Sequence, residues 1–250
     1  MSSTHNLQTF LANAKNTTSR EVLVAHRLIY ELKLAAARGN IDLRVYHPDV
    51  DRDGFDLVLE AEEATKKIQT KVVYQGSGTK AWEIHKPMLR PSPWYSEHLG
   101  FEPTVAGTGL DGGVLIIDLA IDGQELSLSY RYFDVDLLLA RILGFTTATP
   151  PSHESKLREF HRALMQAPYR GKISLPAWML FSAKDAESLL ALMGLPCRLN
   201  ITWPMHLRTA AALTWKAPGV RGDLELSSRV AREELDLLTL GAAGAVLDNG

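Results

Sequence analysis

The sequence predicts an α/β protein with a mixed central β-sheet flanked by helices and with an α-rich C-terminal part. One long helical pattern is followed by three short segments of β-type alternation, and two further β-type segments surround an Asp-Gly turn. Several helical patterns then fill the last hundred residues. The chain has 250 residues, of which 46% are apolar, so it can form a full core in one large or two small domains.

The first element is predicted to be a helix at residues 19–38, because apolar residues recur there at helical spacing. Thr18 and Glu21 have the spacing of a capping box at its N-terminus. Gly39 provides the expected stop.

Three β-type segments follow, at residues 43–46, 55–60 and 67–74, with the turn-forming Gly54 between the first two. Residues 76–113 are irregular and rich in glycine and proline. We expect this stretch to be a long working loop with one short helix.

A hairpin and a helix are predicted next. The β-type segments 114–121 and 126–133 flank Asp122-Gly123, a dipeptide that commonly turns a β-hairpin. An apolar helical pattern follows at residues 135–143. The sheet is expected to gain its last strands here.

A connection is predicted at residues 144–152, which contain three threonines and two adjacent prolines. It divides the chain into a first region, 1–150, and a C-terminal α/β region of unknown role, 151–250. The second region is predicted to contain helices at 153–166, 184–193 and 227–240 and a strand at 198–203.

Charge and composition exclude several classes of function. With 27 basic and 29 acidic residues, the formal charge of −2 argues against a surface coated with basic residues, so any nucleic-acid contact must be a local patch. The single cysteine, Cys197, rules out an internal disulfide and a Cys-rich zinc site. No apolar run has the length of a membrane span, and no secretory signal is visible. We expect a cytoplasmic protein without a membrane partner.

One metal-binding interpretation of residues 47–60 is an EF-hand calcium loop. Five residues match its positions 1, 3, 5, 6 and 12, namely Asp49, Asp51, Asp53, Gly54 and Glu60. The context argues against it, because Pro48 follows a β-type segment where the incoming helix should run. In addition, the charged Asp56 takes the normally apolar position 8, and no second hand is present.

The second interpretation places Asp56 at the start of one strand and Gln69 and Lys71 on the next. Because side chains alternate along a strand, Gln69 and Lys71 share a face. If the two strands pair as a hairpin, Asp56 can reach that face and meet them. The alternatives are that Asp56 only caps a turn and that Lys71 is a solvated strand residue.

The order of a helix, then Asp-Gly-Phe-Asp, then Ile-Gln-Thr-Lys resembles the PD-(D/E)xK nuclease superfamily in its Gln-x-Lys variant, with a restriction-endonuclease-like core. The resemblance covers residues 1–75 well and extends weakly to residue 145. It implies that Asp56 is a metal ligand, that Gln69 replaces an acidic ligand and that Lys71 is the catalytic lysine. Glu21 matches the helix carboxylate that many members contribute, although it alternatively only closes the capping box.

By this resemblance the cofactor is Mg²⁺ or Mn²⁺, which stabilises charge on the scissile phosphate and activates the attacking water. Lys71 would orient that water or help to remove its proton. The neutral oxygen of Gln69 can ligate, but it carries no full charge. Asp56 and Glu21 together balance one divalent ion. We therefore expect one tightly held metal, with any second ion weak and dependent on the substrate phosphate.

Substrate contacts are expected from the stretch that follows Lys71. Its basic side chains offer phosphate contacts, and its aromatic side chains could stack on exposed bases. The basic residues are Lys80, His85, Lys86 and Arg90, and the aromatic ones are Trp82, Trp94 and Tyr95. Solvated basic residues and core tryptophans are the alternatives.

The expected function is that of a metal-dependent nuclease that hydrolyses phosphodiester bonds, with DNA as the substrate, in restriction or phage defence. The chain has no zinc finger, arginine-rich tail or helix-turn-helix pattern that would indicate sequence-specific reading. The alternative is a non-catalytic nuclease-fold subunit that uses residues 151–250 to assemble with a partner protein or with further copies of itself.

Overall fold

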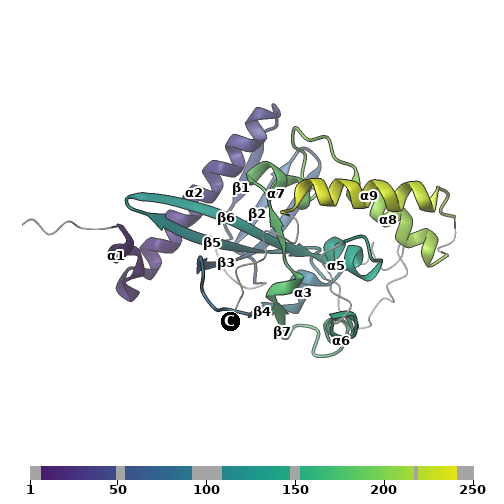
Figure 1. Ribbon diagram of the computed structural model, residues 1–250, viewed down its shortest axis with the longest axis horizontal. Helices are drawn as coiled ribbons and strands as arrows, with labels where there is room; N and C mark the ends of the chain where they lie inside the picture. Colours follow the sequence, from purple (N-terminus) through teal and green to yellow (C-terminus); the bar gives the residue numbers. More distant parts are fainter. Residues whose placement is uncertain (1–6, 49–53, 92–108, 147–152, 217–218, 241–250) are drawn as a thin grey trace, which may run out of the picture.

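The structure, a computed structural model, describes residues 7–48, 54–91, 109–146, 153–216 and 219–240 (Figure 1). Its centre is a six-stranded mixed sheet with the strand order β1-β2-β3-β5-β6-β8. β3 and β5 pair in parallel, and every other neighbouring pair in this sheet is antiparallel. The strands are β1 (Leu43–Tyr46), β2 (Leu57–Ala61), β3 (Ala64–Tyr74), β5 (Gly113–Asp122), β6 (Glu125–Asp134) and β8 (Phe181–Ala183).

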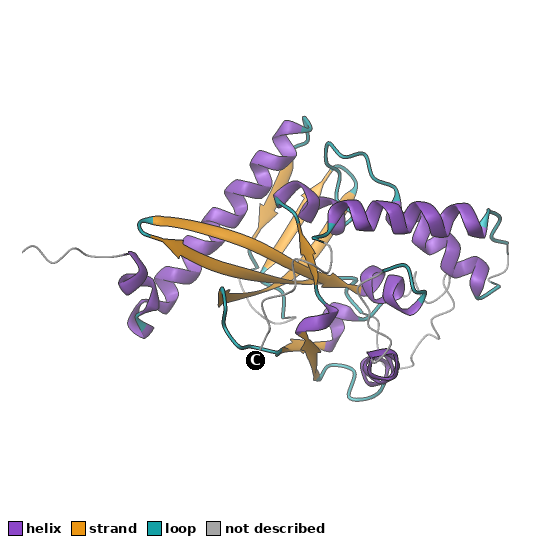
Figure 2. Ribbon diagram, viewed as in Figure 1, coloured by secondary structure: helices purple, strands orange, loops and turns teal. Residues whose placement is uncertain are grey.

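Helices surround the sheet, and a separate two-stranded sheet lies beside it (Figure 2). The small sheet pairs β4 (Ala81–His85) with β7 (Lys172–Pro176) in antiparallel orientation. The helices are α1 (Leu7–Ala12), α2 (Thr17–Arg38), α3 (Lys86–Leu89), α5 (Val135–Ile142), α6 (Glu154–Met165), α7 (Ala186–Leu192), α8 (Trp203–Thr214) and α9 (Leu224–Leu238). The predicted class, a mixed α/β sheet flanked by helices, is confirmed. Among the described helices, none is both long enough and apolar enough to cross a membrane.

The first helix is confirmed, but its start differs from the prediction. It begins at Thr17, and its N-cap Asn16 makes no side-chain capping bond. Thr18 therefore lies inside the helix, and the predicted capping box between Thr18 and Glu21 is wrong. Gly39 ends the helix as expected, and its backbone N–H donates to the carbonyl of Ala36.

The second hairpin follows the prediction closely, whereas the first is longer than predicted. Gly123 has φ of +60° in the turn between β5 and β6, which matches the expected Asp-Gly turn. β3 begins at Ala64, two residues after the turn residue Glu62, whose φ is +53°. The sequence contains no glycine or asparagine at that turn, so the earlier start of β3 had no signal.

The stretch predicted as a working loop contains regular structure. β4 and α3 occupy residues 81–89, and residues 92–108 lie outside the described part of the chain. The strand predicted at residues 198–203 is wrong, because Trp203 instead begins α8. The carboxylate of Glu234 accepts hydrogen bonds from the backbone N–H groups of Thr202 and Trp203, and so satisfies donors that the helix start leaves unpaired.

The C-terminal region is built into the same core as the first region. β7 pairs with β4, and β8 pairs with β6 at the edge of the central sheet. Buried apolar side chains from both sides of residue 150 form one cluster, from Val24 in α2 to Leu238 in α9. Residue 150, which itself lies outside the described residues, is therefore not a boundary between two cores. The helices predicted at 153–166, 184–193 and 227–240 are confirmed as α6, α7 and α9, within a few residues at their ends.

The two faces of the central sheet have different neighbours. Strand pairing connects Val72, Ile117 and Tyr130 in a row across the sheet, so their side chains share one face. The hydroxyl of Tyr130 donates to the carboxylate of Glu31, and α2 therefore covers this face. The opposite face is covered by β4 and α6, since Phe160 of α6 packs edge-on against Phe133 of β6.

Candidate functional site

The best-defined polar contact near the predicted site joins Asp56 to Thr70. Oδ2 of Asp56 accepts hydrogen bonds from the backbone N–H of Thr70 at 2.6 Å and from its hydroxyl at 2.8 Å. The backbone N–H of Asp56 in turn donates to the carbonyl of Ile68 at 2.8 Å. Asp56 is thereby held against β3 by three hydrogen bonds.

This contact follows from a change of partner along β3. The pairing with β2 ends where Leu57 meets Ile68, and the pairing with β5 begins at Ile68 on the other side. The N–H of Thr70 points to the same edge as the carbonyl of Ile68, because backbone groups two residues apart point the same way. The Asp56 side chain pairs with this donor beyond the end of β2.

Gln69 and Lys71 lie on the face of the sheet opposite to α2. They are one and three residues from Val72, so alternation sends their side chains away from the face that α2 covers. The side chain of Gln69 is buried, and its Oε1 lies 3.4 Å from the backbone nitrogen of His85, which donates to it. Lys71 is half-buried and makes no ion pair with any residue that the structure describes. The structure thus brings Asp56 to Thr70, the residue between Gln69 and Lys71, and the Thr70 hydroxyl that Asp56 contacts lies on the α2 face.

His85 holds the turn that leads into Asp56. A Cβ atom at Gly54 would lie 2.7 Å from the imidazole ring of His85, so the ring packs directly on the glycine. Gly54 also has φ of +79°, a conformation that L side chains rarely adopt. Gly54 is therefore required twice, for its backbone conformation and for the close approach of His85. His85 was expected as a substrate contact, and the structure shows a packing contact next to the site.

Glu21 is not brought to this site. It lies one turn before the buried Val24 on α2, yet it is exposed to solvent. The helix that carries it covers the face opposite to Gln69 and Lys71. The helical stripe predicts which side of α2 turns towards the sheet, but it does not predict which face of the sheet α2 covers. The expected pairing of Glu21 with Asp56 around one ion does not fit this arrangement.

Two of the four predicted phosphate contacts are buried. The ammonium of Lys86 donates to the backbone carbonyls of Ala163 at 2.7 Å and Gln166 at 3.0 Å, at the C-terminal end of α6. Arg90 is buried over the ring of Tyr169 at 4.7 Å, and burial lowers the pKa of its guanidinium. These side chains hold the structure together, which corrects the expectation for both of them. Lys80 is exposed and remains available.

The aromatic residues of the same stretch divide in the same way. Trp82 is buried, and its ring packs under the guanidinium of Arg131 at 5.1 Å. Arg131 also forms a two-fold ion pair with Asp118, at 2.6 and 2.7 Å. Trp82 is therefore a core residue and not a platform for bases. Trp94 and Tyr95 lie outside the described residues.

The candidate donors for a metal ion are one carboxylate and one amide. Oδ1 of Asp56 and Oε1 of Gln69 are hard oxygen ligands of the kind that Mg²⁺ accepts, together with water and substrate phosphate. Within the described residues, no group of three or more His, Cys, Asp or Glu side chains is placed to hold a metal. Asp56 and Gln69 are therefore the candidate protein ligands, and together they offer one full negative charge. Of the calcium-loop residues, Asp49, Asp51 and Asp53 lie outside the described part, and Glu60 pairs with Arg44 at 3.1 Å.

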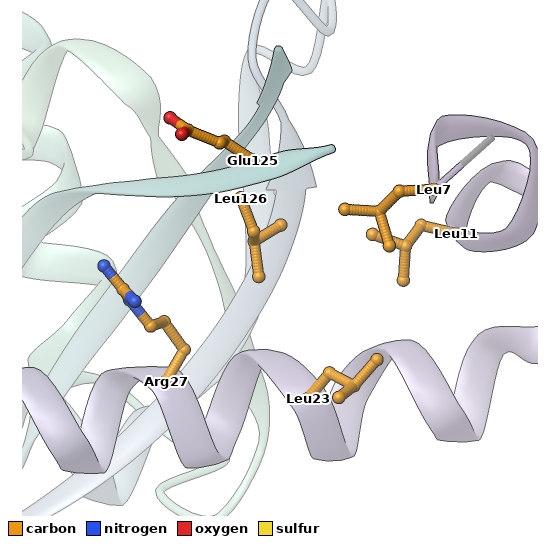
Figure 3. Close-up of a pocket in the computed structure, with 6 residues that line it drawn as sticks. All are labelled: Leu7, Leu11, Leu23, Arg27, Glu125 and Leu126. Atoms are coloured by element: carbon orange, nitrogen blue, oxygen red, sulfur yellow. The ribbon is translucent and has the colours of Figure 1, made fainter. Parts of the chain in front are cut away.

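A separate groove lies between α1, the start of α2 and the β5–β6 hairpin, which extends past the rest of the sheet (Figure 1). Figure 3 shows that Leu7, Leu11 and Leu23 face Leu126 across it, with charged groups at one end. These groups are Arg27 and Glu125. The groove is mainly apolar and shares no residue with the Asp56 site.

Comparison of the chain with protein-family models, with curated proteins and with solved structures finds no match in any of the three.

The contact between Gly54 and His85 predicts a double-mutant effect on stability. Gly54→Ala adds a strained backbone conformation and a clash, together about 2–4 kcal/mol of the free energy of unfolding. Gly76→Ala is the matched control, because Gly76 has the same φ of +79° and nothing within 4 Å of an added Cβ. Urea unfolding should show a smaller loss for Gly76→Ala.

Adding His85→Ala to Gly54→Ala should relieve the clash and recover about 0.5–3 kcal/mol relative to the sum of the single changes. Additive effects of Gly54→Ala and His85→Ala in the same unfolding experiment would contradict the packing described here.

Proposed function

We propose that the protein is a metal-dependent nuclease of the PD-(D/E)xK type that hydrolyses phosphodiester bonds of DNA, with restriction or phage defence as its setting. The observation that carries the proposal is the fixed position of the Asp56 carboxylate at Thr70, the residue between Gln69 and Lys71 on β3. A mixed sheet flanked by helices is also the class of fold expected for a restriction-endonuclease-like core.

In this proposal Asp56 and Gln69 bind the metal ion, and Lys71 activates the attacking water. A bound divalent ion would stabilise charge on the scissile phosphate and lower the pKa of the attacking water. Asp56 and Gln69 would hold that ion through their side-chain oxygens. Lys71, half-buried on the face of Gln69, would orient the water by hydrogen bonding or accept its proton.

The small number of negatively charged ligands lowers the metal affinity that we expect. Since Glu21 lies on the helix of the opposite face, Asp56 is the one negative ligand among the residues assigned to the ion. A single carboxylate and a neutral amide leave a divalent ion short of charge, and Mg²⁺ then relies on water and substrate phosphate. We therefore propose a weakly held ion that binds together with DNA, in place of the tightly held ion expected from the sequence.

The roles of Asp56 and Lys71 can be separated by mutation. Asp56→Asn removes the charged ligand, so it should weaken Mn²⁺ binding in calorimetry and lower cleavage of DNA by about 10²-fold or more. Lys71→Ala should lower cleavage similarly while Mn²⁺ binding persists, because the ligands stay in place.

Lys33→Ala, an exposed lysine on α2, is the control for loss of positive charge and should cleave as the wild type does. Comparable cleavage by the wild type and Lys71→Ala would contradict the proposed mechanism, in which Lys71 activates the water. A wild type that cleaves neither DNA nor RNA with Mg²⁺ or Mn²⁺ would overturn the proposed function.

Gln69→Glu tests the neutral ligand. The change adds a negative charge beside Asp56, and a unit charge at about 4 Å is worth about 4 kcal/mol at an effective dielectric of about 20, before desolvation. Mn²⁺ binding by calorimetry should therefore be preserved or become tighter. Loss of Mn²⁺ binding by a variant that still folds, as judged by circular dichroism, would remove Gln69 from the ligand set.

The rival function is a non-catalytic nuclease-fold subunit that acts by assembly, and one surface favours it. One stripe of α2 exposes Leu23, Tyr30 and Leu34, with exposed fractions of 45%, 58% and 39%, and the guanidinium of Arg27 lies over Tyr30. At one end of this stripe, Leu23 and Arg27 also line the groove that faces Leu126. The intervals between residues 23, 27, 30 and 34 are four, three and four, so they are the same from either end of the helix. A two-fold antiparallel pair of α2 helices would place Leu23 against Leu34 and Arg27 against Tyr30 of a second copy.

This self-association predicts that Tyr30→Glu converts a dimer into a monomer in sedimentation equilibrium. Tyr46→Glu is the control, because Tyr46 on β1 is 46% exposed and lies on another element. A wild type that is monomeric at every concentration would exclude the α2 pair, and DNA cleavage by the wild type would exclude the non-catalytic function.

A further inference from the structure

We propose that Thr70 is a positioning residue that orients the Asp56 carboxylate for the divalent ion, so that the middle residue of the Gln-x-Lys motif sets the metal affinity. This inference rests on the proposed nuclease function. It concerns a residue that the motif leaves open and that the sequence did not single out.

One residue, Thr70, donates two hydrogen bonds to the same carboxylate oxygen of Asp56. The backbone N–H of Thr70 at 2.6 Å and its hydroxyl at 2.8 Å both donate to Oδ2 of Asp56. Two donors from different directions hold the carboxylate against rotation more firmly than the backbone donor alone. Oδ1 has no hydrogen-bond partner among the described residues and is the oxygen left for a metal.

The position of Thr70 on the strand lets it act without entering the substrate side of the sheet. Alternation places its side chain on the α2 face, while Gln69 and Lys71 point to the other face. Asp56 lies at the edge of β3 that β2 leaves unpaired. A β-branched side chain is also restricted in χ1, so the hydroxyl keeps its direction.

The backbone donor remains whichever residue stands at position 70, apart from proline. The hydroxyl is therefore the donor that depends on which residue stands at position 70, and serine or threonine can supply it from a strand at this point. Partners that fix a ligating carboxylate typically change metal affinity by about 10–100-fold when they are removed.

The test compares three changes in the full chain. Thr70→Val keeps the shape and the β-branching but removes the hydroxyl, and Thr70→Ser keeps the hydroxyl. Thr65→Val is the matched control, because Thr65 is an exposed threonine on the same strand. Mn²⁺ affinity is measured by calorimetry, and DNA cleavage is measured as a function of Mg²⁺ concentration, with thermal unfolding as the check on folding.

Thr70→Val should weaken Mn²⁺ binding by about ten-fold or more and raise the Mg²⁺ concentration for half-maximal cleavage by a similar factor, with kcat at saturating Mg²⁺ close to that of the wild type. Thr70→Ser should stay within about three-fold of the wild type, and Thr65→Val should not differ from it. Thr70→Ala, which adds no methyl contact, should repeat the shift and replaces Thr70→Val if that variant does not fold.

The outcomes separate the two proposals. If the wild type binds Mn²⁺ and cleaves DNA but Thr70→Val and Thr70→Ala have the wild-type metal dependence, the role of Thr70 is wrong and the nuclease function stands. A loss of thermal stability without a change in metal dependence makes Thr70 merely structural and also overturns the inference. A wild type that neither binds Mn²⁺ nor cleaves nucleic acid overturns both.

Discussion

The change of partner at Ile68 is the constraint on which the site depends. β3 is the longest strand of the sheet, and β2 is shorter, so the two can pair only up to Leu57 and Ile68. β3 continues beyond that point with β5 as its neighbour on the other side. The edge that β2 leaves behind carries the backbone donor of Thr70. An aspartate directly before β2 reaches that donor, and this fixes a carboxylate at Thr70, the residue between Gln69 and Lys71 in the sequence.

The second constraint is the division of the sheet into two faces. α2 covers the face of Val72 and Tyr130, and the C-terminal half of the chain supplies β7 and α6 to the other face. Residues 151–250 are thereby required for the surroundings of the site, since β4, which bears His85, pairs with β7. A chain shortened near residue 150 would lose the strand that holds His85 against Gly54. The site is local in sequence, but its support is not.

The sequence predicted local features better than relations between elements. Helix α2 and the β5–β6 hairpin were visible because spacing and turn residues determine them locally. β7 and β8 were missed because each is short and is stabilised by a distant strand, β4 or β6. The contact of Asp56 with β3 could be derived from one hairpin, which is also local, while its meeting with Gln69 and Lys71 on one face stays a prediction. The place of Glu21 could not be derived, because no pattern within α2 specifies which face of the sheet the helix covers.

The sequence predicted too many phosphate contacts after Lys71, because two of the basic residues are buried. Their burial also affects how the site would bind its ligands. Lys86 is used at the end of α6, and Arg90 is buried against Tyr169, so the local positive charge facing a substrate is lower than the sequence indicates. The negative charge of the site is low too, with Asp56 as its single assigned carboxylate. A weakly charged site attracts neither a free cation nor DNA strongly. Because coupling between two ligands is reciprocal, each of them then binds best when the other is present. In the proposed nuclease, metal and phosphate would therefore enter as a pair, and the orientation of one carboxylate by Thr70 would have a large share in deciding whether they stay.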